Sequence, residues 1–263
     1  MCSSDLLQEV TTAIQGWDDS VPFAAQYFGG AGEEYARRHD LTADTFARIE
    51  VKGRRHAANN PYAVFRDPLT VEEILASPRI YGPLTRLQCC PPTCGEAFAQ
   101  RHGLARSVVI RAQAMTTDAS STFNDEDMTK VVGYDATASA ARHVYESAGV
   151  DPRDVAVVEL HDCFTTNEVI SYEALELVEE GGAEKFIVDG ENTYGGRVVT
   201  NPSGGLLSKG HPLGATGLAQ CAELVWQLRG EAGARQVKDA RLGLQHNIGL
   251  GRACVVTLYE AVN

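Results

Sequence analysis

The fold is decided by the stretch N-P-S-G-G-L-L-S-K-G-H-P-L-G-A-T-G, residues 201–217. It places His211 among glycines, and a helical pattern begins directly behind it at Thr216. Glycine permits a positive φ and a close backbone approach, and the first turn of a helix presents free N–H groups and a positive potential. The stretch therefore predicts a loop that favours an anionic or polarised oxygen.

The composition is that of a folded globular protein. Of the 263 residues, 44% are hydrophobic and 22% are charged, which allows one or two cores. The formal net charge of -12 argues against a generally basic surface for nucleic acid or anionic membrane. No run approaches the roughly 18 to 20 apolar residues of a membrane span, and the start has no basic region followed by an apolar one. We therefore expect a cytosolic protein that acts on small molecules, with no nucleic-acid partner and no integral membrane segment.

The cysteines indicate a reducing compartment rather than a disulfide framework. There are seven of them, an odd number, and only Cys89, Cys90 and Cys94 cluster, in C-C-P-P-T-C. Two prolines stiffen that loop, and no second pair of cysteines or histidines stands nearby to complete a zinc set. Packing cysteines are therefore the favoured interpretation, a metal site is the weaker alternative, and we expect no metal.

The first third of the chain predicts helices followed by an irregular segment. Residues 20–60 have no strand pattern, and residues 61–95 contain six prolines, which favour extended pieces and turns. A helix that begins near Thr42 should place three side chains on one face: Phe46, Ile49 and the stem of Lys52.

From Ser107 onward, strand and helix patterns alternate. Strands are expected at 107–115, 155–162, 241–248 and 253–259, and helices at 136–149, 167–177 and from Thr216. The helix from Thr216 should bury one apolar face made of Leu218, Cys221, Ala222, Val225 and Leu228. This order predicts an α/β fold, a layered sheet with helices on both faces, in which ligands lie at the carboxyl ends of strands.

Three segments at expected strand ends or loops carry reactive side chains. They are His161-Asp162-Cys163-Phe164, Gly210-His211-Pro212 and His246-Asn247-Ile248-Gly249. Histidines, a thiol and glycine amides together suit carbon–carbon or acyl chemistry, where a carbon acid needs a base and an oxyanion needs donors. Taken singly, each has a structural alternative: a hydrogen-bonded histidine, a packed cysteine, or a turn.

These residues resemble the thiolase family, and within it the sterol carrier protein X-type thiolases. The resemblance extends from about Val21 to Tyr259 and is carried by N-T-Y-G-G-R, by residues 201–217 with the L-A-Q-C-A-E-L that follows, by W-Q-L-R-G-E-A-G and by L-Q-H-N-I-G. It implies a thiolase-like fold with a mixed sheet between helices. It also implies cleavage of 3-oxoacyl-CoA with coenzyme A, or the reverse Claisen condensation, through an acyl-cysteine in lipid breakdown. Coenzyme A would then be a substrate, with no cofactor.

The resemblance also implies roles for individual residues. His211 would activate the nucleophilic cysteine and donate to the thioester oxygen, and His161 would complete that oxyanion hole. Cys163 would be the acid/base that moves the α-proton, and the Gly249 N–H would serve a second oxyanion hole. A thiol with an ordinary pKa needs a neighbouring imidazole or helix dipole to act as a shuttle, and His161 and His211 are available for this. Substrate contacts are implied for Ser203, Gly204 and Asn247.

The sequence departs from the thiolase pattern in three places. Thiolases carry the nucleophilic cysteine in a first domain, in a C-A-T-G-type turn, and the surroundings of Cys2 do not match it. Relatives have a run of small and apolar residues between the positions of Gly95 and Glu96. Arg252 replaces a glycine, and its side chain either obstructs the catalytic loop or extends into solvent.

The resemblance implies three parts with unequal completeness. Residues 1–84 correspond to a loop-domain remnant, 85–106 to a remnant of the amino-terminal domain, which is mostly missing, and 107–263 to the carboxyl-terminal domain. The chain is then a truncated gene product, an incomplete sequence or a relative without the nucleophile. Apolar surface should be exposed where the first domain packs, and the homodimer expected of an intact member is formed largely through that domain.

The leading hypothesis is a thiolase that acts on acyl-CoA and coenzyme A, with long or 2-methyl-branched acyl chains as expected substrates. The alternative is a non-catalytic acyl-CoA- or lipid-binding protein, or a subunit of a partner-dependent carbon–carbon lyase. The chain ends in A-V-N rather than an S-K-L-type address, which favours a cytosolic location over the peroxisomal one of animal relatives.

Overall fold

The structure is a computed structural model that describes residues 3–90, 107–249 and 253–262. Several sequence expectations lie outside these residues. They concern Cys2, Cys94, the Gly95–Glu96 junction, Arg252 and most of the segment 85–106.

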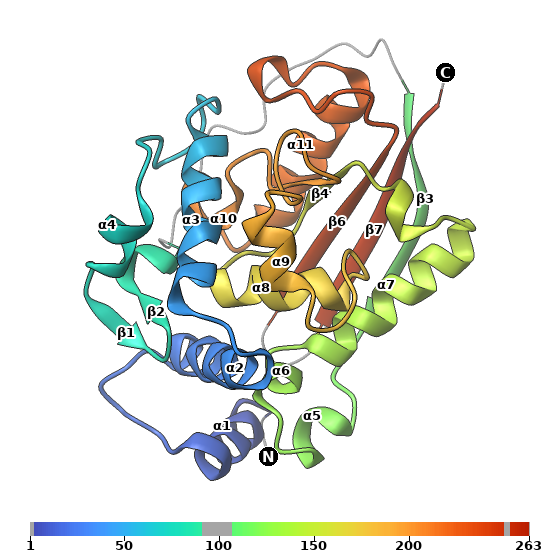
Figure 1. The fold of residues 1–263 in the computed structure, drawn as a ribbon. Helices are drawn as coiled ribbons and strands as arrows, with labels where there is room; N and C mark the ends of the chain where they lie inside the picture. The colour runs from blue at the N-terminus through green and yellow to red at the C-terminus, as the bar shows by residue number, and fades with distance from the viewer. Residues whose placement is uncertain (1–2, 91–106, 250–252, 263) are drawn as a thin grey trace.

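A mixed sheet forms the centre of the fold (Figure 1). The described strands form a five-stranded sheet in the order β3-β7-β6-β4-β5, in which the first three are antiparallel and the last three parallel. Their bounds are β3 (Ser107–Thr116), β7 (Ala253–Val262), β6 (Leu242–Gly249), β4 (Val157–Glu159) and β5 (Val199–Thr200). The expected α/β fold and the four expected strands are confirmed, while β5 was not predicted because it is only two residues long.

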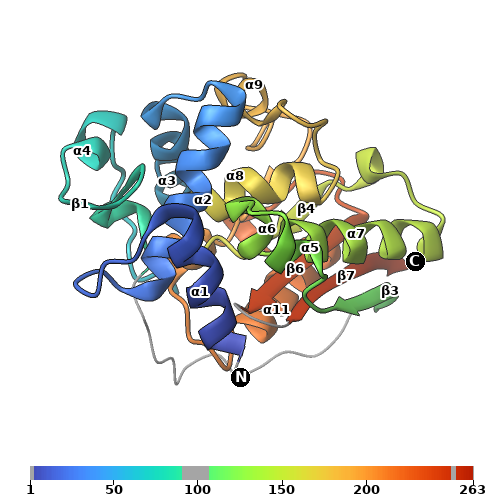
Figure 2. The ribbon, with the colours of Figure 1, turned by 90° about the horizontal axis from the view of Figure 1, so that it is seen from below.

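Helices cover both faces of this sheet. Figure 2 shows the strands between α7 (Tyr134–Ala148) on one side and α11 (Thr216–Arg229) on the other. As expected, α7 ends at Gly149, which adopts the left-handed conformation with φ 66° and donates to the carbonyls of Tyr145 and Glu146. Helix α8 (Thr165–Ala174) packs against α7, and all ten of its residues are buried.

Residues 3–90 supply the helices that pack against α8 from the other side. Helices α2 (Phe23–His39) and α3 (Ala43–Ala57) both contact α8, and α3 also contacts α9 (Ala183–Val188) and α10 (Gly205–Lys209). The predicted helical character of residues 20–60 is confirmed, and so is the shared face of α3, because Phe46, Ile49 and Lys52 are all buried. The ammonium of Lys52 forms a buried ion pair with Glu168 of α8 and donates to Thr200 at 2.6 Å.

The proline-containing segment is irregular, as expected, with one helix that was not predicted. Helix α4 (Val71–Leu75) begins at a capping box, in which the Thr70 hydroxyl accepts from the Glu73 N–H and the Glu73 carboxylate accepts from the Thr70 N–H. The other short elements are α1 (Ser3–Gln15), β1 (Arg79–Tyr81), β2 (Leu84–Thr85), η1 (Arg86–Gln88), α5 (Ser121–Asn124), α6 (Met128–Val131), η2 (Pro152–Asp154) and η3 (Gly233–Arg235). No helix in the described ranges combines the length and apolarity that crossing a membrane requires.

The prediction that α11 buries an apolar face is wrong. Leu218 is 69% exposed, and of the five residues expected on that face only Leu228 is fully buried. The helix instead turns a largely polar face inward, where each polar group has a partner. The Gln220 amide donates to the His246 carbonyl at 3.0 Å, and Glu223 forms an ion pair with Arg235. These partners are distant in sequence, so the apolar spacing alone did not reveal them.

Candidate active site

The structure brings His161 and His211 together. His161 lies two residues beyond the end of β4, and His211 follows α10 after a single glycine. Their ring centroids are 5.0 Å apart and the ring planes are at 89°, so the edge of one imidazole faces the other. Two loops separated by about fifty residues of chain therefore present their imidazoles to one site.

A cavity of about 720 Å³ opens beside the two histidines. Five of the predicted site residues line it: His161, Cys163, His211, Asn247 and Gly249. Most of the remaining wall is apolar, and it includes Phe23, Phe28, Phe164, Leu213, Ile248 and Val255. The site therefore combines a few polar groups with a large apolar surface, as small-molecule sites commonly do.

Ser203 and Gly204 lie elsewhere. The Ser203 hydroxyl donates to Glu159 at 2.8 Å and its backbone N–H donates to the same carboxylate at 3.0 Å. Gly204 has φ 95° and lies against Ala57 of α3, where a Cβ would overlap the Ala57 side chain. Neither residue lines the cavity. The implied substrate contacts of these two residues therefore have no counterpart at the cavity wall, and their turn packs the loop against α3.

The tautomer of His211 follows from its partner Thr216. The Thr216 hydroxyl donates to the Pro212 carbonyl at 3.1 Å and lies 2.8 Å from Nδ1 of His211. Both contacts are satisfied as hydrogen bonds when Nδ1 carries the proton and donates to Thr216, because the carbonyl can only accept. Burial lowers the pKa of His211, and the charge of Lys209 lowers it further. The imidazole is therefore neutral at neutral pH, and its Nε2 lone pair is available as a base.

His161 is fully enclosed and neutral. Burial lowers its pKa to about 3, the charges of His211 and His246 contribute in the same direction, and a hydrogen bond with the Asn247 side chain opposes them. Its Nδ1 has no hydrogen-bond partner among the described residues. Behind it, the His161 backbone N–H faces Nδ1 of His246 at 3.5 Å. The His161 ring is therefore neutral, and its Nδ1 is itself buried rather than exposed to the cavity.

The thiol of Cys163 remains protonated. Burial raises its pKa well above the usual range, and the neighbouring Cys90 and Asp162 raise it further. The expectation that His161 and His211 tune this thiol toward the thiolate thus has no support in its surroundings. A protonated thiol in the cavity is suited to donate a proton, and it needs a developing carbanion to accept that proton.

Cys90 belongs to the cavity wall and was not predicted there. Its backbone N–H donates to the Cys163 carbonyl at 3.1 Å, and Cys89 forms a β-bridge with Phe164. Burial raises the pKa of Cys90 to about 12. Within the described residues no group of three or more histidine, cysteine or acidic side chains is arranged to hold a metal ion. The Cys89-Cys90 pair is visible in the sequence, but its contact with the His161 segment arises only when the chain is folded.

Asp162 points away from the cavity and fixes the two loops to each other. Its carboxylate accepts from the Leu206 N–H at 2.6 Å and from the Leu207 N–H at 3.4 Å, in the first turn of α10. A Cβ at Gly205 would overlap this carboxylate, and Gly205 has φ 63°. Glycine is therefore required where the loop of His161 meets the helix that leads to His211.

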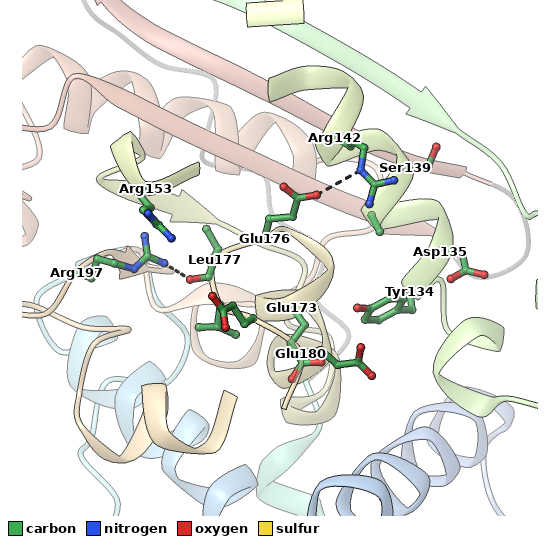
Figure 3. A pocket seen from close by; sticks show the side chains of 13 residues that line it. Tyr134, Asp135, Ser139, Arg142, Arg153, Glu173, Glu176, Leu177, Glu180 and Arg197 are labelled. Atoms are coloured by element: carbon green, nitrogen blue, oxygen red, sulfur yellow. Dashed lines mark hydrogen bonds and ion pairs between the residues drawn. The ribbon is translucent and has the colours of Figure 1, made fainter. Parts of the chain in front are cut away.

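A second cavity, of about 740 Å³, lies between α7 and the segment that follows α8 (Figure 3). Its wall is rich in charged side chains, and several already have partners. Arg142 pairs with Glu176 at 3.5 Å, and Arg197 donates to the Leu177 carbonyl. None of the predicted site residues lines this second cavity. The candidate active site is therefore the cavity of His161 and His211.

The chain is similar to known proteins in sequence and in fold. The chain is 54% identical to sterol carrier protein 2 of Rattus norvegicus over 248 residues, which are 91% of this chain and 45% of that protein. It is 40% identical to an acetyl-CoA acetyltransferase of Methanothermobacter thermautotrophicus over 252 residues, 91% of this chain and 64% of that protein. The chain thus spans about half the length of the sterol carrier proteins that it matches.

A solved structure described as an Ltp2-ChsH2(DUF35) aldolase shares the fold. It superposes with a TM-score of 0.77 over 90% of this chain and 63% of its own, at 23% sequence identity. Residues 115–259, which contain the cavity residues His161, Cys163, His211, Asn247 and Gly249, match the family described as thiolase C-terminal domain-like. By this match and by its mixed sheet, the chain belongs to the thiolase C-terminal domain-like family.

Proposed function

We propose that the chain supplies the acid/base and oxyanion-binding part of a thiolase, an acyltransferase that cleaves 3-oxoacyl-CoA with coenzyme A or runs the reverse condensation. The single observation that carries this proposal is the meeting of His161 and His211 at 5.0 Å beside an apolar cavity that also contains Cys163. Membership of the thiolase family supports the reaction class. The apolar wall supports an acyl chain as ligand.

Each residue has a defined step in the proposed thiolysis. Nε2 of His211 takes the proton of a nucleophilic cysteine, whose sulfur attacks the 3-oxo carbon. His161 donates to the oxyanion that forms, and its neutral ring is suited to this. When the bond between C2 and C3 breaks, the Cys163 thiol gives its proton to C2 and releases acyl-CoA. The Cys163 thiolate then takes the proton of an incoming coenzyme A, whose sulfur removes the acyl group from the nucleophilic cysteine. His211 returns its proton to that cysteine as it leaves.

The nucleophile in this proposal belongs to polypeptide outside the present sequence. The sterol carrier proteins are about twice as long as the segment that they match. The resemblance to thiolases implies that the nucleophilic cysteine lies in a first domain. The exposed apolar side chains of α11 and β3 support a missing neighbour, because Leu218 and Met115 are both well exposed. We also propose that the intact protein is a cytosolic homodimer and that the matched segment alone forms no acyl-enzyme.

The experiment compares this chain with a version extended by the upstream reading frame. Thiolysis of acetoacetyl-CoA and of a longer 3-oxoacyl-CoA should be measured for both, together with His211→Ala and Cys163→Ala in the extended form. Turnover only in the extended form, reduced at least about a hundredfold by either substitution, is expected. Near-normal kcat in both variants would refute the assigned roles. An acyl adduct on the unextended chain by mass spectrometry would refute the external nucleophile.

A second candidate is non-catalytic binding of acyl-CoA or lipid, alone or as a subunit of a carbon–carbon lyase. The observation in its favour is the predominantly apolar wall of the cavity. Binding of a fluorescent fatty acyl-CoA by the extended protein, without any thiolysis or condensation, would support this candidate over the enzyme.

A further inference from the structure

Each of the two histidines follows a buried charged residue at the same spacing. Glu159 ends β4 two residues before His161, and Lys209 ends α10 two residues before His211. The Lys209 ammonium lies 3.7 Å from Oε2 of Glu159, and the two side chains are only 10% and 0% exposed. A buried ion pair therefore lies behind the imidazole pair and joins the same two segments of chain.

The two partners are held to different degrees. The Glu159 carboxylate accepts from the backbone N–H and the hydroxyl of Ser203, so its position is fixed. The Lys209 ammonium forms no hydrogen bond with any described residue, and its close charged contact is Glu159. A buried cation that has no hydrogen bond is costly unless its charge is used or compensated.

We propose that the Glu159–Lys209 ion pair is a positioning device for the two histidines of the proposed thiolase site. It ties the end of β4 to the end of α10 and places one positive charge behind both imidazoles. A second contact joins the same two segments at the other end of α10. There the Asp162 carboxylate accepts from the Leu206 N–H and caps the helix. The inference rests on the proposed function only in calling these histidines catalytic.

The surrounding charges show what removal of each partner does. Lys209 lowers the pKa of His161 and of His211, and His161 is further affected by His211, His246 and a hydrogen bond with Asn247. Burial raises the pKa of Glu159, Lys209 lowers it and Glu223 raises it. Burial also raises the pKa of Asp162, which Lys209 lowers. Without the cation, protonated His211 is less disfavoured and its pKa must rise. Without the Glu159 charge, the cation is uncompensated and the pKa of His211 must fall further.

The test is a titration of the histidine ring signals by NMR on the chain as it exists. In Lys209→Met the His211 pKa should rise by about half a unit or more, and in Glu159→Gln it should fall. Lys209→Arg should stay near the wild-type value. The control is Lys238→Met, because Lys238 is an exposed lysine outside this arrangement. Opposite shifts of the His211 pKa in the two variants indicate a charge effect. General loosening of the structure would instead move the pKa in both variants toward the ordinary histidine value.

An unchanged His211 pKa in Lys209→Met, or shifts of the same sign in Lys209→Met and Glu159→Gln, would overturn the proposal. If Lys209→Met does not fold, Glu159→Gln decides, because glutamine keeps one of the two oxygens that accept from Ser203. The titration needs no turnover. If the pKa shifts occur as predicted but the extended protein shows no thiolysis, the role of the ion pair is supported and the proposed reaction is rejected. In an active extended form, the acid limb of the kcat/KM profile should move with the His211 pKa.

Discussion

The hydroxyl of Thr216 accepts a hydrogen bond from Nδ1 of His211 at 2.8 Å and donates a hydrogen bond to the Pro212 carbonyl. The first residue of α11 therefore sets which nitrogen of His211 faces the cavity without a hydrogen. This relationship, together with the other packing contacts of the site, leads to the following predictions.

Replacing Thr216 by valine should remove the acceptor of the His211 Nδ1 proton. The ring is then free to adopt the other tautomer, and we expect kcat/KM of the extended protein to fall by about tenfold, the effect of roughly 1.4 kcal/mol in a barrier. Thr216→Ser keeps the hydroxyl and should stay within about twofold of wild type. Nitrogen-15 chemical shifts of His211 report the tautomer independently of activity. Equal shifts in the valine and serine variants would contradict the assigned hydrogen bond.

His246 should make stability depend on pH in a defined direction. Burial lowers its pKa to about 3, so the folded ring stays neutral while the unfolded ring takes up a proton below its ordinary value of 6.5. The stabilising contribution is therefore present above pH 6.5 and is lost as the pH falls toward 3. Relative to His246→Gln, the wild-type free energy of unfolding should decrease by about 1.4 kcal/mol per pH unit between pH 6 and 4. Urea unfolding at several pH values measures this difference, and parallel curves would contradict it.

The ion pair of Lys52 and Glu168 should stabilise the docking of α3 on α8. Lys52→Met leaves the buried Glu168 without its charged partner, and we expect a loss of about 3–5 kcal/mol in the free energy of unfolding. Adding Glu168→Gln to that variant should recover most of the loss, since no buried charge is then uncompensated. The exposed pair of Lys185 and Asp189 provides the control, and Lys185→Met should leave the free energy of unfolding close to the wild-type value. Similar losses from both single lysine substitutions would count against the docking role.

Gly205 should tolerate no side chain. Gly205→Ala combines the strain of a left-handed residue, about 1–2 kcal/mol, with an overlap against Asp162 that adds about 1–3 kcal/mol. Gly195 also has a positive φ, 89°, but nothing lies within 4 Å of a Cβ there, so Gly195→Ala should show the strain alone. Chemical denaturation of both variants separates the two contributions. A loss at Gly205 no greater than that at Gly195 would mean that the Asp162 contact has no energetic weight.

The exposed apolar side of α11 should cause self-association of this chain. Leu218→Glu introduces a charge where the side chain is now solvent-exposed, and we expect a smaller oligomeric fraction in sedimentation velocity without loss of folding. Val188→Glu is the matched control, because Val188 is an exposed apolar residue on α9, away from this face. Equal effects of both substitutions would assign the association to overall charge rather than to α11.

Local patterns predicted the elements with strong periodicity. The face of α3 was predicted from the spacing of Phe46, Ile49 and Lys52, because those side chains meet the core at helical intervals. The same reasoning failed for α11, where Gln220 and Glu223 are buried against partners from distant segments. Burial of polar groups depends on such partners, which a linear pattern does not contain.

The part of the candidate site that could be predicted consists of residues at the ends of strands or at the starts of helices. His161, Cys163, Asn247 and Gly249 reached the cavity because β4 and β6 are parallel neighbours that end at one edge of the sheet. Ser203 is only eight residues before His211, yet it turns toward Glu159 because that carboxylate needs donors. The cavity wall formed by Cys90, Phe23 and Phe28 depends on the packing of the first 90 residues and was not visible in any motif.

Helix α8 is buried over its whole length, and the two walls of the cavity therefore differ in rigidity. Its amide hydrogens exchange with solvent only when α2, α3, α7 and α9 separate from it, so they report a large-scale opening of the molecule. The segment that leads from His161 into α8 shares that rigidity. On the wall formed by the His211 loop, Leu213 lies two residues after His211 and is 83% exposed. We therefore expect a bulky ligand of this cavity to gain its space by displacement of the His211 loop or of α2, while the His161 wall stays in place.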